Sequence, residues 1–285
     1  MAKTQDIKRR IRSVGNTRQL TRAMKMVSAA KLRRAQERII KARPYAHRVL
    51  RTLRSLAARA NPELNPLLQV HDGNHVEIFV LTGDKGLCGS FNANIVRKGE
   101  LLTQELTERE ITISAVGKRG RDYYGRRGFN IYRAWIDVFR DVQFPLAAEM
   151  ADDIMQRYAK CELDEVYLVY NEFKSAIQCR PVIQRLLPVE PLEPEQGETA
   201  DDYIYEPEPA HLFEKLLPHY VQQTVFQSLL ESVAAEHAAR MTAMDNATKN
   251  AGELIESLTL HMNKVRQTAI TTEILEVVSG AEALT

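Results

Sequence analysis

Both ends of the chain read as helices far longer than a domain of this size needs. Residues 1–60 and 209–284 keep helical apolar spacing almost throughout, and at 1.5 Å per residue each makes a rod of roughly 90–110 Å if continuous. The first 60 residues carry eighteen Lys and Arg against two acidic residues, a net charge of +16, whereas residues 206–285 carry a net charge of −6. Two long arms of opposite charge favour a chain that folds back on itself as a helical hairpin.

The apolar stripe of the first arm is helical but interrupted. It falls into three blocks whose registers do not join, unlike a uniform leucine zipper. The blocks are Ile7, Ile11 and Val14; Leu20, Met24 and Val27; and Val49, Leu53, Leu56 and Ala60. Pro44 predicts a kink or a stop near Arg43, and Asn61-Pro62 is expected to end the arm.

The second arm is more regular. Ten of its residues alternate spacings of 3 and 4 without interruption, which is typical of a coiled-coil seam. They are Met241, Met244, Thr248, Ala251, Ile255, Leu258, Met262, Val265, Ala269 and Thr272. Gly252 is a weak point in this helix, and Gly280 suits its C-terminal stop.

Between the arms, short apolar strands alternate with helices. The expected strands are residues 75–82, 110–116, 129–132, 164–170 and 181–188, and the expected helices are residues 91–106, 117–127 and 145–160. This order predicts the α/β class with a largely parallel, doubly wound sheet. We therefore divide the chain into an N-terminal helix (1–60), an α/β domain (70–190), an acidic, proline-rich connecting loop (191–208) and a C-terminal helix (209–285).

The loop Gly83–Ser90 (GDKGLCGS) lies between a strand and a helix, where α/β proteins bind phosphate. Its G-x-x-G-x-x-G spacing matches neither G-x-G-x-x-G nor G-x-x-x-x-G-K-[ST], because Lys85 precedes the second glycine. A tight turn with Ser90 as the helix N-cap is favoured, and a phosphate site is the alternative. Cys88 is a weaker candidate nucleophile, because no histidine lies nearby in sequence to activate it.

Nothing in the sequence indicates a metal centre, a cofactor or a catalytic pair. The seven histidines form no H-x-x-x-H pair. Cys88, Cys161 and Cys179 are far apart and are interpreted as small buried side chains in a reducing compartment. No apolar run approaches the roughly 20 residues of a spanning helix, and the start lacks the apolar core of a signal peptide. We expect a protein of the cytosolic side.

The charge of the first arm indicates an acidic partner. An arm that binds nucleic acid interleaves aromatic side chains for stacking, and Tyr45 is the only aromatic residue among the first 60. An acidic protein surface is therefore favoured over nucleic acid, and a solvated helix face is the remaining alternative.

Three segments together resemble the gamma subunit of bacterial F-type ATP synthases. They are IKRRIRSVGNTRQLTRAMKMVSAAKLRRAQ near the start, the loop GDKGLCGSFNANI, and EHAARMTAMDNATKNAGELIESLTLHMNKVRQTAITTEILEVVSGAEAL at the end. The resemblance covers nearly the whole chain. We see neither the cysteine-bearing insertion of chloroplast members nor a mitochondrial presequence in this sequence.

The resemblance implies a fold and a task. The terminal helices form a long antiparallel coiled coil, the central stalk, beside a Rossmann-like α/β domain. The stalk stands in a hexamer of alpha and beta subunits, which hold the nucleotide sites, and its foot meets the epsilon subunit and the c ring. Proton flow turns ring and stalk together, which couples rotation to ATP synthesis or hydrolysis. The chain is then a non-catalytic subunit without a cofactor, a peripheral membrane protein on the cytoplasmic side of the bacterial inner membrane.

The resemblance also assigns contact residues by position. Those expected to meet the beta subunits are Met24, Lys25, Arg266, Gln267, Thr271 and Glu273. Those expected to meet the c ring and epsilon subunit are Tyr203, Tyr205 and Glu206. The apolar tip, suited to turning in an apolar collar because hydrophobic contact is non-directional, consists of Ile270, Ile274, Val277, Val278 and Leu284.

Two other classes stay open at this stage. A Rossmann-like enzyme that oligomerises through a coiled coil predicts ligand binding at Gly83–Ser90. A helical-hairpin arm that binds RNA predicts nucleic-acid affinity that falls steeply with salt.

Overall fold

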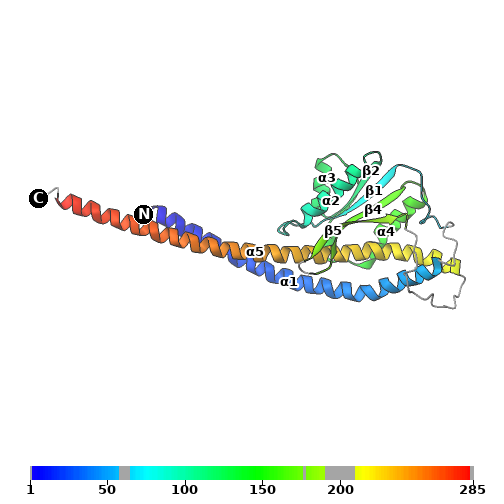
Figure 1. Ribbon diagram of the computed structural model, residues 1–285, viewed down its shortest axis with the longest axis horizontal. Helices are drawn as coiled ribbons and strands as arrows, with labels where there is room; N and C mark the ends of the chain where they lie inside the picture. Colours follow the sequence, from blue (N-terminus) through cyan, green and yellow to red (C-terminus); the bar gives the residue numbers. More distant parts are fainter. Residues whose placement is uncertain (1, 58–64, 176–177, 190–208, 283–285) are drawn as a thin grey trace. The chain divides into compact units, whose positions relative to one another are not determined.

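The computed structural model describes residues 2–57, 65–175, 178–189 and 209–282 (Figure 1). The chain divides into two compact units, residues 1–29 with 240–285 and residues 30–239. The first unit pairs the N-terminal part of α1 (Ala2–Ala57) with the C-terminal part of α5 (Pro209–Glu282). The second unit contains the remainder of both helices and a five-stranded sheet.

The sheet has the strand order β3-β2-β1-β4-β5. Its strands are β1 (His75–Leu81), β2 (Glu110–Val116), β3 (Asn130–Trp135), β4 (Glu165–Phe173) and β5 (Cys179–Leu187). The first four are parallel and β5 is antiparallel to β4. Parallel neighbours need crossover connections, which contain α2 (Phe91–Glu105), α3 (Lys118–Arg126), the 3-10 helix η2 (Val138–Arg140) and α4 (Phe144–Ala159). The predicted largely parallel α/β sheet is confirmed.

Two strands are longer than their apolar patterns indicate. β3 continues to Trp135 rather than Tyr132, and β4 continues to Phe173 rather than Tyr170. The end of β4 is set by its pairing with β5, where Phe173 faces Cys179. Pairing with a neighbouring strand therefore determines where β3 and β4 end. Polar residues that interrupt the apolar pattern do not end either strand.

The central strand β1 separates two kinds of packing. Ile78 and Val80 on one face pack with Ile95 of α2 and Tyr124 of α3 in one apolar cluster. Side chains alternate along a strand, so Glu77 points to the opposite face. That carboxylate is fully buried in the middle of the sheet, and its partners are considered in the Discussion.

The two helices of the first unit run antiparallel. Thr21 Oγ1 and Thr248 Oγ1 lie 2.8 Å apart, and Lys25 Nζ lies 2.6 Å from Asp245 Oδ1. From the first pair to the second, the residue number rises in α1 and falls in α5, so the two pairs define one antiparallel register. The predicted seam of α5 is confirmed from Met241 to Ala269, because every residue of the predicted series in this range is buried or half-buried. Thr272, the last residue of the series, is exposed.

The buried side of α1 is continuous, contrary to the interrupted stripe predicted above. Positions spaced alternately by 4 and 3 stay buried or half-buried along the helix, apart from Arg18. They are Ile7, Ile11, Val14, Thr21, Lys25, Ser28, Leu32, Ala35, Ile39, Ala42, Ala46, Val49, Leu53 and Leu56. Leu20 and Val27, which were assigned to the stripe, are 62% and 56% exposed. The register was hidden because polar residues occupy this side of the helix: Thr21 and Ser28 are buried, and Lys25 is half-buried.

α1 does not stop near Arg43. It continues through Pro44 to Ala57. Proline removes one backbone hydrogen bond and crowds the preceding turn, but Pro44 lies on the exposed side. Ile39 before it and Val49 after it are both buried, so packing on the opposite side holds the helix through this point.

Two glycines have room for a side chain, and their different backbone conformations predict opposite effects of alanine on stability. Gly15 lies within α1 and Gly128 has a φ of +78°, and no atom lies within 4 Å of where a Cβ would stand at either position. Gly15→Ala should raise the free energy of unfolding by about 0.5–1 kcal/mol, because alanine loses less backbone entropy in a helix. Gly128→Ala should lower it by a similar amount, because positive φ strains an L side chain. Urea denaturation followed by circular dichroism measures both, and a loss of stability in Gly15→Ala would contradict a regular helix there.

Candidate functional site

A polar layer crosses the coiled coil of the first unit. Lys25 and Lys249 both approach Asp245, at 2.6 and 3.2 Å, and the two threonine hydroxyls of Thr21 and Thr248 share a hydrogen bond beside them. Hydrogen bonds from Lys25 and then Lys249 hold the pKa of the Asp245 carboxyl below its usual range. A polar layer in a coiled coil selects one register, since any shift would leave these groups facing apolar residues.

The layer contains one of the residues predicted to meet a beta subunit. Lys25 is bound to Asp245 within its own unit, although its side chain is still 43% exposed. Met24 beside it is half-buried, and its carbonyl accepts a hydrogen bond from Ser28 at 2.8 Å. Lys25 therefore stabilises the helix pair and also reaches its surface.

The other four predicted contacts lie elsewhere along α5. Arg266, Gln267, Thr271 and Glu273 are all exposed. Arg266 follows Asp245 by more than five helical turns, which is about 30 Å along the axis. The structure thus separates the six residues into two groups instead of gathering them into one cluster.

The C-terminal end of α5 is apolar and exposed. The register that pairs Thr21 with Thr248 brings the start of α1 opposite α5 near Ala269, so α5 beyond that point has no facing helix. Figure 1 shows this end of α5 continuing past the N-terminus of α1. The four described residues of the predicted tip are exposed by about half or more: Ile270, Ile274, Val277 and Val278. A contiguous apolar surface of this kind is typical of an interaction site.

Tyr203, Tyr205 and Glu206, predicted to meet the c ring and epsilon subunit, and Leu284 of the tip lie outside the described residues. The acidic connecting loop, residues 191–208, lies outside them as well.

The loop Gly83–Ser90 is closed by partners from its own domain. Asp84 Oδ1 accepts a hydrogen bond from the Lys118 backbone N–H at 2.9 Å, and Oδ2 accepts one from the Asp137 N–H at 3.1 Å. The Gly83 N–H donates to Asn92 Oδ1 at 2.8 Å. The loop's own carboxylate therefore binds the first backbone amide of α3, and its first amide is bound by a side chain of α2. The tight-turn interpretation fits this geometry.

The predicted cap at Ser90 is wrong in its chemistry. Ser90 stands at the N-cap position of α2, but its side chain makes no capping hydrogen bond to the helix backbone. Its hydroxyl accepts one from the Asn94 side-chain amide at 3.2 Å. The backbone φ of −85° and ψ of 3° at Ser90 lie outside the extended region that an N-cap usually adopts.

The cysteines differ from one another in burial. Cys88 is buried as predicted, and its sulfur accepts a hydrogen bond from the Asn92 amide at 3.2 Å. Cys161 is exposed at a φ of 57°, and Cys179 is half-buried. The expectation that all three are buried is therefore wrong for Cys161 and Cys179, because turn and strand-end positions give them too few neighbours.

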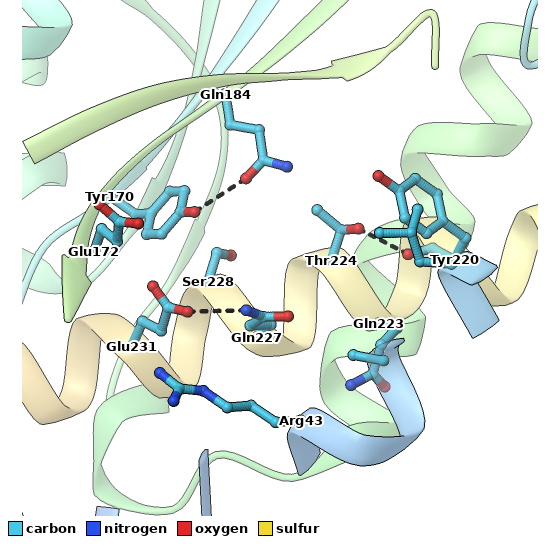
Figure 2. Close-up of a pocket in the computed structure, with 12 residues that line it drawn as sticks. Arg43, Tyr170, Glu172, Gln184, Tyr220, Gln223, Thr224, Gln227, Ser228 and Glu231 are labelled. Atoms are coloured by element: carbon cyan, nitrogen blue, oxygen red, sulfur yellow. Dashed lines mark hydrogen bonds between the residues drawn. The ribbon is translucent and has the colours of Figure 1, made fainter. Parts of the chain in front are cut away.

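A polar cavity that the sequence did not reveal lies between the β4–β5 hairpin and the two long helices. It has a volume of about 310 Å³, and Figure 2 shows Glu231, Gln227 and Arg43 on one side facing Tyr170 and Gln184 on the other. Glu231 Oε1 accepts a hydrogen bond from the Gln227 amide at 2.9 Å, and burial raises the pKa of the Glu231 carboxyl. The lining comes from segments far apart in the chain, so periodicity carried no signal for it.

Hydrogen bonds of the lining residues connect the hairpin to α5. Glu231 Oε2 accepts a hydrogen bond from the Phe173 N–H at 3.4 Å, which ties α5 to the end of β4. Across the hairpin, the Tyr170 hydroxyl donates to Gln184 Oε1 at 3.0 Å. The bond from Phe173 gives the buried Glu231 carboxylate a hydrogen-bond partner.

Within the described part of the chain, no group of three or more His, Cys, Asp or Glu side chains is arranged to hold a metal ion. Among the same residues, no helix combines the length and apolar character needed to cross a membrane.

Comparison with known proteins gives a consistent result over the whole chain. The family described as ATP synthase matches residues 3–284. The ATP synthase gamma chain of Pelotomaculum thermopropionicum is 44% identical over 286 residues, covering 100% of both chains. That of Solibacter usitatus is 49% identical over 282 residues, covering 98% of each.

Solved structures agree with these relatives. A chain from the central stalk and c-ring of the Tetrahymena thermophila mitochondrial ATP synthase is 28% identical, with a TM-score of 0.60, covering 80% of this chain and 99% of that one. A chain from the OSCP/F1/c-ring part of the Euglena gracilis mitochondrial ATP synthase has a TM-score of 0.69 at 19% identity, covering 99% of this chain and 95% of that one. The second likeness concerns the fold alone.

Proposed function

This chain belongs to the ATP synthase gamma-chain family, and we propose that it is the central stalk and rotor of a proton-translocating F-type ATP synthase. It turns with the c ring and couples that rotation to ATP synthesis or hydrolysis in the hexamer of alpha and beta subunits. Through the same coupling it regulates the activity of the complex and its proton flow. The chain itself is a non-catalytic subunit.

The observation that carries this proposal is the exposed apolar end of α5. A heptad seam and a polar layer fix α5 against α1, and then α5 runs on beyond its partner with Ile270, Ile274, Val277 and Val278 uncovered. A paired helix is stiff, as a shaft must be. An apolar end turns in an apolar collar without a deep energy minimum, because hydrophobic contact has no preferred direction.

Two groups of contact residues suit two levels of a surrounding hexamer. Met24 and Lys25 lie at the polar layer, and Arg266, Gln267, Thr271 and Glu273 lie about 30 Å away along α5. We assign the beta-subunit contacts to both groups. The basic residues of α1 add attraction for acidic segments of those subunits and make the faces of the stalk unequal.

The foot of the stalk is assigned to the segment that contains Tyr203, Tyr205 and Glu206, in contact with the c ring and the epsilon subunit. This placement makes the chain a peripheral membrane protein on the cytoplasmic side of the bacterial inner membrane. The closed geometry at Asp84 supports a structural role for the Gly83–Ser90 loop rather than a nucleotide site of the stalk itself.

Reconstitution with alpha and beta subunits tests the proposal. The full chain should co-purify with the hexamer, and a bead attached through the exposed thiol of Cys161 should rotate stepwise when ATP is added. Hexamer without the chain is the control and should show no such rotation. Steady ATP hydrolysis by a hexamer that holds the chain, with the bead stationary, would contradict the rotor role.

A further inference from the structure

A groove of about 270 Å³ in the second unit is bordered by four cationic side chains. Lys31, Arg34 and Arg38 come from α1, where spacings of three and four residues bring them to one side of the helix. Arg140 comes from η2, a separate element. The positive charge therefore surrounds a hollow instead of only following the helix.

The floor of the groove is apolar. Phe139, Val142 and Leu230 line it, and each is at least nine-tenths buried. A low-dielectric wall beneath charged groups focuses their field toward the open side. An anion that enters this hollow is attracted more strongly than one at an open helix face.

Little of this charge is compensated by the chain. Arg38 Nη1 lies 3.2 Å from Asp141 Oδ1, and Arg38 also donates to the Val142 carbonyl. Hydrogen bonds from Gln143 and then Arg38 lower the pKa of the Asp141 carboxyl. Among the described residues that line the groove, Asp141 is the one carboxylate. For Lys31, Arg34 and Arg140, no carboxylate of the described residues lies within ion-pair distance. Three cations are left facing the hollow.

We propose that this groove binds a small anion with several phosphate groups in a row. Three of its four cations are arginines, whose planar forks match phosphate oxygens two at a time. At a share of about 30 Å³ per water molecule, the hollow is large enough for more than one phosphate group. A free polyphosphate and the triphosphate of a nucleotide share this chemistry. The site goes beyond the stalk role, and its absence would leave that role untouched.

Titration calorimetry on the full chain, with tripolyphosphate and ATP as separate probes, tests the site. The variant Arg34→Gln/Arg140→Gln should weaken tripolyphosphate binding at least tenfold. The matched control is Arg12→Gln/Arg33→Gln, which removes the same charge from α1 outside the groove; Arg33 there pairs with Glu37 at 3.4 Å. The control should weaken binding less than threefold, through general screening alone.

The two probes also distinguish the sources of phosphate. Equal affinity for tripolyphosphate and ATP supports a site for the phosphate chain alone, and tighter binding of ATP supports added contact of the nucleoside with the apolar floor. The proposal is overturned if neither probe binds, or if the control variant weakens binding as much as the groove variant. It is also overturned if a glutamate-rich peptide binds more tightly than both probes and displaces them, since the groove is then a docking surface for protein.

Discussion

Replacing Arg157 with alanine should lower the free energy of unfolding of the α/β domain by about 3–5 kcal/mol, because the change leaves a buried charge without its partner. Glu77 lies in the central strand and is 0% exposed. Its carboxylate accepts hydrogen bonds from the Arg157 guanidinium and from the Ser114 hydroxyl. Of these, only the Arg157 interaction brings a compensating charge.

The loss should depend on pH in a defined direction. Burial raises the pKa of Glu77, and the bond from Ser114 and the charge of Arg157 oppose that rise. Without Arg157 the folded-state pKa rises further, so the folded domain retains a proton that the unfolded chain releases above about pH 4.5. Up to the parent's own raised folded-state pKa, both folded proteins hold the Glu77 proton, so the variant should be close to the parent there. Its deficit should grow as the pH rises from that value toward the higher folded-state pKa of the variant.

Urea denaturation of parent and variant across a pH series measures this effect. The matched control is Arg133→Ala, because Arg133 pairs with Glu149 at 2.9 Å on the surface, with both side chains about half exposed. A surface pair of this kind is worth roughly 0–1 kcal/mol. If Arg157→Ala costs no more than Arg133→Ala at neutral pH, the buried pair is not what stabilises the sheet.

The second large effect is expected in the assembled ATP synthase, where Arg266→Glu should lower coupled ATP turnover by more than about tenfold. Arg266 is exposed on α5, and no ion pair involves it among the described residues, so the isolated fold should be unaffected. Reversal of a charge that is paired across a buried interface costs 2 kcal/mol or more, which corresponds to more than tenfold.

Proton pumping and ATP hydrolysis, measured in membranes that carry the complex, report this coupling. The control is Lys264→Glu, which makes the same charge change two residues away, on nearly the opposite side of the helix. It should retain most of the coupling. Unchanged coupling in Arg266→Glu, or equal losses in both variants, would remove Arg266 from the proposed beta-subunit contacts.

The sequence predicted the secondary structure well where local pattern decides it. The strand Glu110–Val116 and the seam from Met241 onward follow directly from residue spacing. The seam of α1 was misread because Thr21 and Ser28 are polar yet buried. Their hydroxyls bond the helix backbone or the facing threonine, which removes the usual cost of burial.

The sequence did not indicate that Arg157 is the partner of the buried Glu77. The two residues are 80 positions apart, one in β1 and one in α4. A charged residue within an apolar strand shows only that some partner is needed. Which cation supplies it depends on the packing of α4 against the sheet.

Apolar periodicity and the alternation of strands and helices are local properties of the chain, so they were enough to predict an α/β domain with a long amphipathic helix before it and another after it. How the two helices align could not be predicted in this way. A heptad pattern repeats every seven residues, so a shift by a whole repeat would satisfy it equally well. Thr21 with Thr248 and Lys25 with Asp245 select one alignment. That alignment sets how far α5 runs beyond α1, and with it the apolar end on which the proposed stalk turns.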